Sequence, residues 1–365
     1  MKLKRIMLLV FVTVIAIAVL YNSSETVKAT QEAIQNCLTS VIPSLMAFMI
    51  VASFVSESPC GDIIGKLIPV KFLFNLPHNC AKTVLLSMLG GYPCGAKMIA
   101  DMLRKNEIDS ETAQRMLGFC INASPAYVIS AIGIGLFGNA KIGTIMWLSH
   151  VSTALLIGIL FRGKPITEKT ATPSYPPVAQ GFVKSVLDST NTMIAISGFV
   201  ITFSAFLTLL KQIGITDFIT TVLNLFIKSK ATSNALFATF FDVVTGSKTC
   251  LDCSPVTAVV LCAGAVSFGG MSIMAQIAYL LSGYNIKFLR IIFFRFIHAV
   301  LTAATVYIII NITDTEVTTA NLIGSNLDKT PTGYITTLLF VLCCACFVIS
   351  SDKNVSTLVQ RRRRS

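Results

Sequence analysis

Long apolar runs, separated by shorter polar segments, dominate this sequence of 365 residues. Eight of the runs have the length and composition of membrane-crossing helices: 6–21, 38–56, 116–138, 142–161, 192–210, 256–283, 291–311 and 334–350. A helix needs about 20 mostly apolar residues to cross the hydrocarbon core of a bilayer. The pattern therefore predicts an all-α polytopic membrane protein with about eight transmembrane helices.

Two shorter apolar stretches, 83–97 and 234–248, contain Gly, Pro or polar residues towards their ends. Each is too short to cross about 30 Å of hydrocarbon as a regular helix. We interpret them as two re-entrant hairpins, which enter the membrane and return to the same side. Irregular backbone at that depth is tolerated where protein buries it or where it lines a wet cavity.

The chain divides into two halves, 38–161 and 192–311, with the same order of parts: span, amphipathic stretch, hairpin, broken span, span. An offset of 148 residues also pairs identical residues: Ser124 with Ser272, Ile129 with Ile277, Gly135 with Gly283, and His150 with His298. These identities are few, so the shared order is the stronger evidence. The expected topology has the two hairpins entering from opposite sides. We therefore predict an inverted internal repeat, an architecture typical of secondary transporters.

Four further segments flank or connect these halves. They are a signal-anchor helix with a polar connector (1–37), a Pro-containing cytoplasmic linker (162–191), an extracytoplasmic loop (312–333), and a last transmembrane helix with a basic tail (334–365). The basic start followed by an apolar run resembles a cleaved signal peptide, but the spans that follow favour a retained first helix.

Composition excludes a soluble protein and supports a membrane orientation. Only 13% of the residues are charged and 54% are hydrophobic, whereas a soluble domain carries about 25% charged residues. The net charge is +12, but the basic residues lie mostly between apolar runs, so we expect no nucleic-acid partner. With a cytoplasmic N-terminus, the inside segments hold 21 of the 29 Lys and Arg, the outside segments hold 7, and Arg295 lies within a span. This bias predicts a multi-pass cell-membrane protein with both termini cytoplasmic.

The two hairpins and the two broken spans supply the candidate substrate-binding residues, because unwound backbone frees polar groups inside the membrane. They are Gly90, Gly91, Tyr92, Pro93 and Gly95 in the first hairpin, Asn122 and Ser124 in the first broken span, Asp242, Thr245 and Gly246 in the second hairpin, and Ser267, Gly269, Gly270 and Gln276 in the second broken span.

Each of these groups also has a structural interpretation. The first hairpin could be a tight turn between packed helices, and the first break a kink at Pro125 whose freed carbonyl is satisfied by Ser124. The second break could serve small-residue helix packing. Asp242 is the most informative position, because a carboxylate inside a bilayer is costly and rarely idle. The alternative is that the Asp242 carboxylate lies in the outer membrane interface, where water solvates it. Lys248 and the backbone amides at 269–270 are its candidate partners.

Other polar residues of the apolar runs are expected to have structural roles. We expect Arg295 to extend to the cytoplasmic surface, and His150 and His298 to be buried packing groups. Cys250 and Cys253 form an isolated CxxC, which is weak evidence for zinc or redox chemistry. The sequence contains no nucleotide-binding or hydrolase motif. We predict no catalytic residues, no metal site and no cofactor, so the chain is not expected to be an enzyme.

Several motifs resemble those of the YlbJ-type sporulation integral membrane proteins. The segments are GGYPCGAK, INASPAYVISAIGIGLFGNAKIG, LSH, FFDVVTGSK and SFGGMSIMAQIAYLLSG, within residues 38–311. That family is grouped with the nucleoside-recognition, or gate-domain, superfamily, so the resemblance implies two gate-type repeats. The chain departs from the family pattern in three ways. Ser124 precedes Pro125 without an intervening Gly, the hairpin acid is Asp242 instead of Glu, and Val244 precedes Thr245 where a Thr is expected.

The favoured function is an integral membrane transporter or channel-like protein for a small polar solute, and its role in endospore formation comes from the resemblance alone. The alternative is a non-transporting membrane scaffold in spore-envelope assembly. The bilayer and the solute are the expected partners. The sequence leaves open whether a coupling cation binds and whether the protein forms a homo-oligomer.

Overall fold

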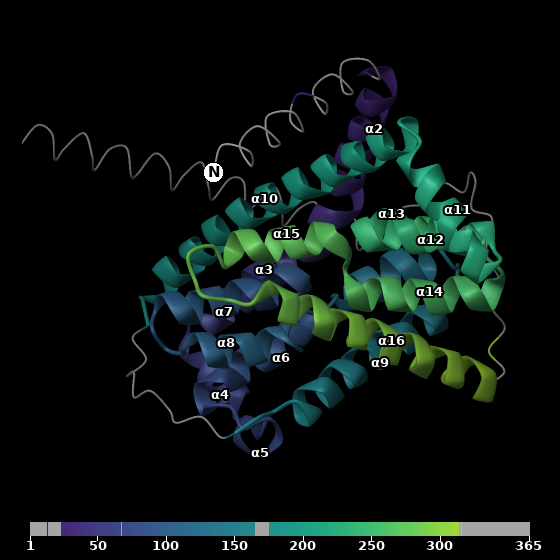
Figure 1. The fold of residues 1–365 in the computed structure, drawn as a ribbon. Helices are drawn as coiled ribbons and strands as arrows, with labels where there is room; N and C mark the ends of the chain where they lie inside the picture. The colour runs from purple at the N-terminus through teal and green to yellow at the C-terminus, as the bar shows by residue number, and fades with distance from the viewer. Residues whose placement is uncertain (1–12, 14–22, 67, 165–174, 314, 316–365) are drawn as a thin grey trace, which may run out of the picture.

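The computed structural model describes residues 13, 23–66, 68–164, 175–313 and 315, and these residues form helices and connecting turns without any strand (Figure 1). The α-helices are α2 (Ser23–Asn36), α3 (Ile42–Ser56), α4 (Pro59–Gly65), α5 (Val70–Phe74), α6 (Ala81–Leu89), α7 (Tyr92–Arg104), α8 (Ser110–Leu117), α9 (Ala140–Leu160), α10 (Val178–Gln212), α11 (Ile215–Ile227), α12 (Lys230–Phe241), α13 (Val243–Thr249), α14 (Pro255–Phe268), α15 (Gly270–Leu280) and α16 (Phe288–Ile312). Two π-helical stretches, η1 (Cys37–Val41) and η3 (Ala126–Ile134), and two single 3-10 turns complete the set.

Four of these helical segments are long and apolar enough to cross a membrane: α9, α10, the α14–α15 segment and α16. A fifth crossing results if α3 and α4, which are bent by 92° relative to each other, count as one span. The prediction of several membrane-crossing helices is therefore confirmed. The described part of the chain does not yield a count of eight, and the predicted spans 6–21 and 334–350 lie outside it.

The predicted span 116–138 is not one helix. Helix α8 ends at Leu117, a non-helical segment follows over 118–124, and η3 begins after Pro125. The predicted span 256–283 is interrupted at Gly269, which has a φ of +85° between α14 and α15. Both interruptions fall where the sequence places Pro or paired Gly, residues that disfavour a continuous helix.

Both predicted hairpins are pairs of helices joined by a sharp turn. Helices α6 and α7 meet at Gly91, and Pro93 lies in the first turn of α7, where a missing N–H is tolerated. Helix α7 continues to Arg104, beyond the predicted end at 97. Helices α12 and α13 meet at Asp242, which has an extended backbone and caps α13 with its side chain.

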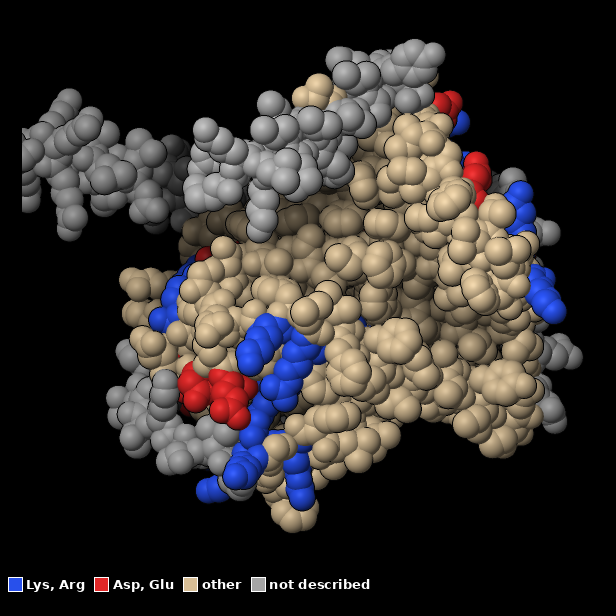
Figure 2. Space-filling model, in the orientation of Figure 1, with Lys and Arg blue, Asp and Glu red and all other residues tan. Residues whose placement is uncertain are grey.

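Charged residues gather at one end of the helical bundle and tie its elements together. Glu57, at the end of α3, pairs with Lys105 after α7 and with Lys184 of α10 at 2.6 and 3.1 Å. At the opposite end, Lys248 Nζ lies 3.3 Å from Asn36 Oδ1 of α2. Segments that the sequence predicts on one side of the membrane therefore meet in space. A broad uncharged face lies between the charged groups (Figure 2).

Helix α10 is longer than the predicted span 192–210. It begins at Val178, directly after Pro177, and so includes residues 178–191 of the segment predicted as a linker. The prolines of that segment lie at 165, 173, 176 and 177. The stretch after them has no residue that would stop a helix, so α10 extends beyond the apolar core to the charged end.

Candidate functional site

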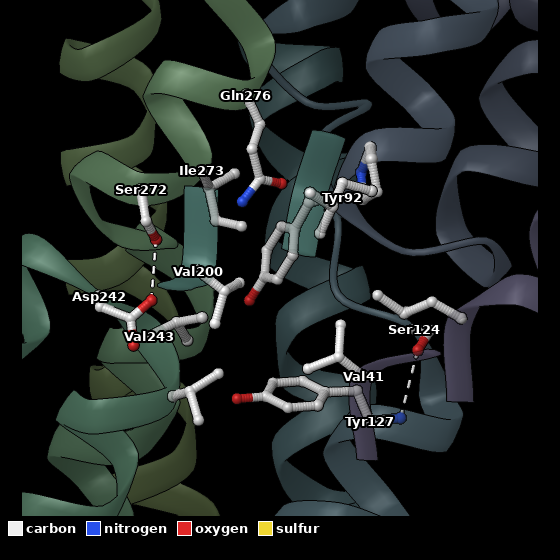
Figure 3. Close-up of a pocket in the computed structure, with 14 residues that line it drawn as sticks. Val41, Tyr92, Ser124, Tyr127, Val200, Asp242, Val243, Ser272, Ile273 and Gln276 are labelled. Carbon is white, nitrogen blue, oxygen red and sulfur yellow. Dashed lines mark hydrogen bonds between the residues drawn. The ribbon is translucent and has the colours of Figure 1, made fainter. Parts of the chain in front are cut away.

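The two hairpins and the two breaks converge around one cavity inside the bundle (Figure 3). Its polar lining comes from six side chains: Tyr92, Ser124, Tyr127, Asp242, Ser272 and Gln276. Apolar side chains of η1, α3 and α10 close the remaining walls, among them Val41, Leu45, Ile196 and Val200. The volume open to the centres of water molecules is about 40 Å³. In this conformation the cavity has room for a few waters or an ion, because one water needs about 10–15 Å³ by this measure.

Asp242 is buried in the wall of this cavity, with 2% of its surface exposed. Its Oδ2 accepts hydrogen bonds from Thr245 N at 2.8 Å and Thr245 Oγ1 at 3.0 Å, and its Oδ1 accepts one from Ser272 Oγ at 2.9 Å. The interpretation of a solvated interfacial carboxylate is therefore wrong. Lys248 is not its partner, because that ammonium bonds to Asn36 at the surface. Asp242 thus joins the second hairpin to α15.

Gln276 is the cavity residue with the most unused hydrogen-bonding capacity. Its exposed fraction is 2%, and neither its amide nitrogen nor its amide oxygen has a hydrogen-bond partner among the described residues. The amide group projects from α15 toward the cavity and toward Tyr92 (Figure 3). Burying such a group without partners costs about 1–3 kcal/mol, and a polar group inside the cavity would relieve that cost.

Tyr92 and Ser124 also line the cavity, but their polar groups have protein partners. Tyr92 Oη donates to the carbonyl of Val266 at 2.6 Å, which links the first hairpin to α14. Ser124 Oγ accepts from Tyr127 N at 3.2 Å and so helps to start η3. The alternative that Ser124 satisfies the carbonyl freed by Pro125 is wrong, because its hydroxyl accepts from Tyr127 N, and the carbonyl of Ile121, four residues before Pro125, accepts from Arg295.

Two glycines allow the backbones to meet at this site. Gly91 has a φ of +85°, and a Cβ there would lie 2.9 Å from Leu45 Cδ2 and 3.7 Å from Ser124 Cβ. Gly270 has a φ of +78°, and a Cβ there would lie 3.0 Å from the carbonyl oxygen of Phe241 and 3.1 Å from Asp242 Cα. L-residues with side chains rarely adopt such φ values. The turn of the first hairpin and the second break thus require glycine.

A cluster of buried polar groups behind the cavity ties the two breaks together. Arg295 is fully buried, and its guanidinium donates to the carbonyls of Ile121, next to the first break, and Phe268, at the end of α14. Its Nη1 also lies 3.2 Å from His298 Nδ1. The expectation that Arg295 extends to the cytoplasmic surface is wrong, because the freed carbonyls at the breaks provide acceptors inside the bundle.

The histidines of this cluster have defined tautomers. His150 Nε2 accepts from Ala123 N at 3.0 Å, so its proton is on Nδ1, which lies 2.8 Å from Ser267 Oγ. His298 Nε2 lies 2.8 Å from the carbonyl of His150 and must donate to it, which leaves Nδ1 to accept from Arg295. Both rings are therefore neutral. The ring of His150 connects the backbone of Ala123, at the first break, with the side chain of Ser267, near the second break.

The remaining predicted site residues lie beside the cavity and do not line it. Asn122 donates to Phe119 O at 2.8 Å, and its Oδ1 has no partner among the described residues. Four glycines lie where the backbone of the hairpins or of the second break packs closely, so that a Cβ would contact neighbouring atoms: Gly90, Gly95, Gly246 and Gly269. Of the predicted residues, the cavity itself is lined by five: Tyr92, Pro93, Ser124, Asp242 and Gln276.

Sequence reasoning missed two parts of the site. Ser272 and Tyr127 line the cavity, and Ser272 is the partner of Asp242 from α15. Arg295 and the histidines position both breaks. A signal existed for each: Ser272 pairs with Ser124, and His298 with His150, at the same offset of 148 residues.

The described residues contain no group of three or more His, Cys, Asp or Glu side chains arranged to hold a metal ion. Cys250 and Cys253 are free thiols. The isolated CxxC therefore has no further ligand within this part of the chain.

Comparison with known proteins identifies one relative along most of the chain. The sequence is 23% identical over 343 residues to the sporulation integral membrane protein YlbJ of Bacillus subtilis, covering 84% of this chain and 83% of that protein. No protein-family model and no solved structure matches the chain. The similarity confirms the resemblance to the YlbJ-type sporulation integral membrane proteins that the sequence motifs indicated.

Proposed function

We propose that the protein is a membrane transporter or channel-like protein for a small polar solute, acting in endospore formation. The observation that carries the proposal is that Asp242 and Gln276 line the same cavity. Both side chains are 98% buried, and the amide of Gln276 has no partner among the described residues. A buried carboxylate and a free amide at interrupted helices are characteristic of solute sites at mid-membrane.

The cavity chemistry favours a solute that donates hydrogen bonds. Asp242 is the cavity's one charged lining residue within the described chain. Its carboxylate suits an N–H or O–H group of the solute, or a coupling cation. Gln276 adds one acceptor and two donors. Ligand pockets measure about 300–1,000 Å³, so the cavity must widen before a solute larger than an ion can bind.

An inverted repeat of gate type is part of the proposal. Residues related by the offset of 148 meet at the centre: Ser124 and Ser272 line the same cavity, and the rings of His150 and His298 lie 4.5 Å apart. Such a central meeting of equivalent residues is expected when two related halves enclose one site. The positive-inside bias of the sequence supports a topology with both termini in the cytoplasm.

The sporulation role rests on the similarity to the sporulation integral membrane protein YlbJ of Bacillus subtilis. The competing proposal is a non-transporting scaffold in spore-envelope assembly. Two observations favour it: the cavity is small, and both oxygens of Asp242 already accept hydrogen bonds from protein groups, one of which caps α13.

A thermal-shift screen of the purified protein separates these two functions. The screen covers nucleosides, amino acids, sugars, polyols and monovalent cations. Transport predicts that at least one compound raises the melting temperature of the wild type but not of the Gln276→Ala variant. If no compound shifts the wild type, and Gln276→Ala supports normal sporulation at normal membrane abundance, the scaffold is the better account.

A further inference from the structure

A second, polar hollow lies at the charged end of the bundle, between α7, α10 and α15. Its volume open to water-sized spheres is about 310 Å³, several times that of the central cavity. Charged side chains of both signs line it: Lys97, Asp101 and Arg104 from α7, and Asp188 from α10. Two cations thus face two anions, so the hollow has no excess charge that would exclude a neutral or zwitterionic solute.

The hollow and the central cavity are stacked along the same three helices. On each helix, a residue that lines the cavity lies one turn away from a residue that lines the hollow. The pairs are Pro93 and Lys97 on α7, Ile196 and Thr192 on α10, and Gln276 and Leu280 on α15. One helical turn spans 5.4 Å, so a barrier about one turn thick separates the two spaces.

An ion pair in the wall of the hollow joins two of these helices next to the barrier. Lys97 Nζ lies 3.1 Å from Asp101 Oδ2 on its own helix and 3.8 Å from Asp188 Oδ2 on α10. It also approaches Ser53 Oγ of α3 at 3.4 Å. The Lys97 side chain is 11% exposed and that of Asp188 is 35% exposed. Lys97 therefore connects the first hairpin to α10 one helical turn beyond Pro93, which lines the cavity.

We propose that the hollow between α7, α10 and α15 is the entry route to the central cavity, and that the Lys97–Asp188 pair holds this route closed. The route opens when α10 separates from α7 and α15, and Gln276 is then the first cavity group that an entering solute meets. This inference rests on the proposed transport function. In the topology proposed above, the hollow faces the cytoplasm.

Single-cysteine accessibility tests the route in a background without native cysteines. Asn191→Cys reports on the hollow, Val200→Cys on the cavity, and the exposed Ile194→Cys on the outer surface of α10. The probe is a membrane-impermeant cationic methanethiosulfonate, applied to inside-out and right-side-out vesicles. We expect positions 191 and 200 to react from the same side, with position 200 slower, and position 194 to react poorly from both sides.

Releasing the ion pair should open the route. An exposed or half-buried ion pair contributes about 0.2–1 kcal/mol, so its loss shifts a closed–open equilibrium by up to about fivefold. We expect Asp188→Asn to speed labelling of Val200→Cys by about two- to fivefold and to leave Asn191→Cys unchanged. The exposed Asp217→Asn, in α11, is the matched control and should change neither rate. Lys97→Gln is the second variant if Asp188→Asn inserts poorly.

The outcomes separate the route from the function. Labelling of position 200 only from the side opposite position 191 overturns the route and leaves transport in place. An unchanged rate at position 200 in both ion-pair variants overturns the role of the pair. A third outcome is that position 191 is labelled but position 200 is not labelled from either side in any variant. This outcome overturns the route together with transport.

Discussion

The imidazole rings of His150 and His298 lie with their centroids 4.5 Å apart, and His298 Nε2 donates to the carbonyl oxygen of His150 at 2.8 Å. One ring comes from α9 in the first half of the chain and the other from α16 in the second. His150 accepts from the backbone of Ala123 and bonds to Ser267. The contact between the two halves is therefore built on the same groups that hold both helix breaks.

Arg295→Lys should destabilise the protein by about 2–4 kcal/mol, because a lysine ammonium cannot replace a guanidinium fork that bonds two carbonyls and a histidine. The measurement is the unfolding midpoint of the detergent-solubilised protein. Arg290→Lys, at an exposed position of the same helix, is the control and should have little effect. Equal midpoints for the two variants would show that Arg295 does not support the breaks.

Gly270→Ala should lower stability and membrane abundance, because the added methyl group meets Phe241 O at 3.0 Å in a backbone conformation that alanine disfavours. We expect a loss of about 1–3 kcal/mol. Gly264→Ala is the matched control in α14, since its Cβ would have no neighbour closer than 3.7 Å. That substitution should be neutral or slightly stabilising, as alanine favours helix. The same unfolding measurement compares them, and a tolerated Gly270→Ala would contradict the close packing described for Asp242.

Labelling of single cysteines tests the orientation in the membrane. Lys184→Cys, at the charged end of α10, should react only from the cytoplasmic side, and Glu25→Cys in α2 only from the outside. Both positions are exposed. The same impermeant thiol reagent is applied to right-side-out and inside-out vesicles. Reaction of both positions from one side would remove the proposed topology and, with it, the inverted relation of the halves.

The sequence was sufficient to predict several apolar helices, the sharp turns within 83–97 and 234–248, and both breaks, because these depend on local composition. Gly91, Pro125 and Gly269 lie in sequences with paired Gly or with Pro, which locally disfavour a continuous helix. The partners across the bundle were not predictable in this way. Arg295 looks like a residue near a span end until the carbonyls of Ile121 and Phe268 are placed beside it.

Asp242 illustrates the same limit. Its position in an apolar hairpin identified it as costly, but Lys248, the nearest cation in sequence, points to the surface. The true partner from outside the hairpin, Ser272, comes from a helix 30 residues later in the chain. Local spacing cannot supply such a pairing, whereas the repeat offset that relates Ser272 to Ser124 hints at it.

In the proposed function, Asp242 acts on a solute in the cavity and does not serve only as a helix cap. Asparagine caps helices about as well as aspartate, so Asp242→Asn should preserve the bond from Thr245 N and keep the fold while removing the charge. Asp242→Glu keeps the charge with a longer side chain and should retain partial function. Asp109→Asn, a cap of α8 that bonds Thr112 N at 2.7 Å, is the control at a distance from the cavity.

The most direct measurement is the yield of heat-resistant spores when each variant replaces the wild-type gene, with membrane abundance measured in parallel. We expect that Asp242→Asn reaches normal abundance but fails to restore spores, that Asp242→Glu restores them in part, and that Asp109→Asn restores them fully. Full restoration by Asp242→Asn at normal abundance would contradict a role of Asp242 in solute binding, because the buried carboxylate would then be only the cap of α13.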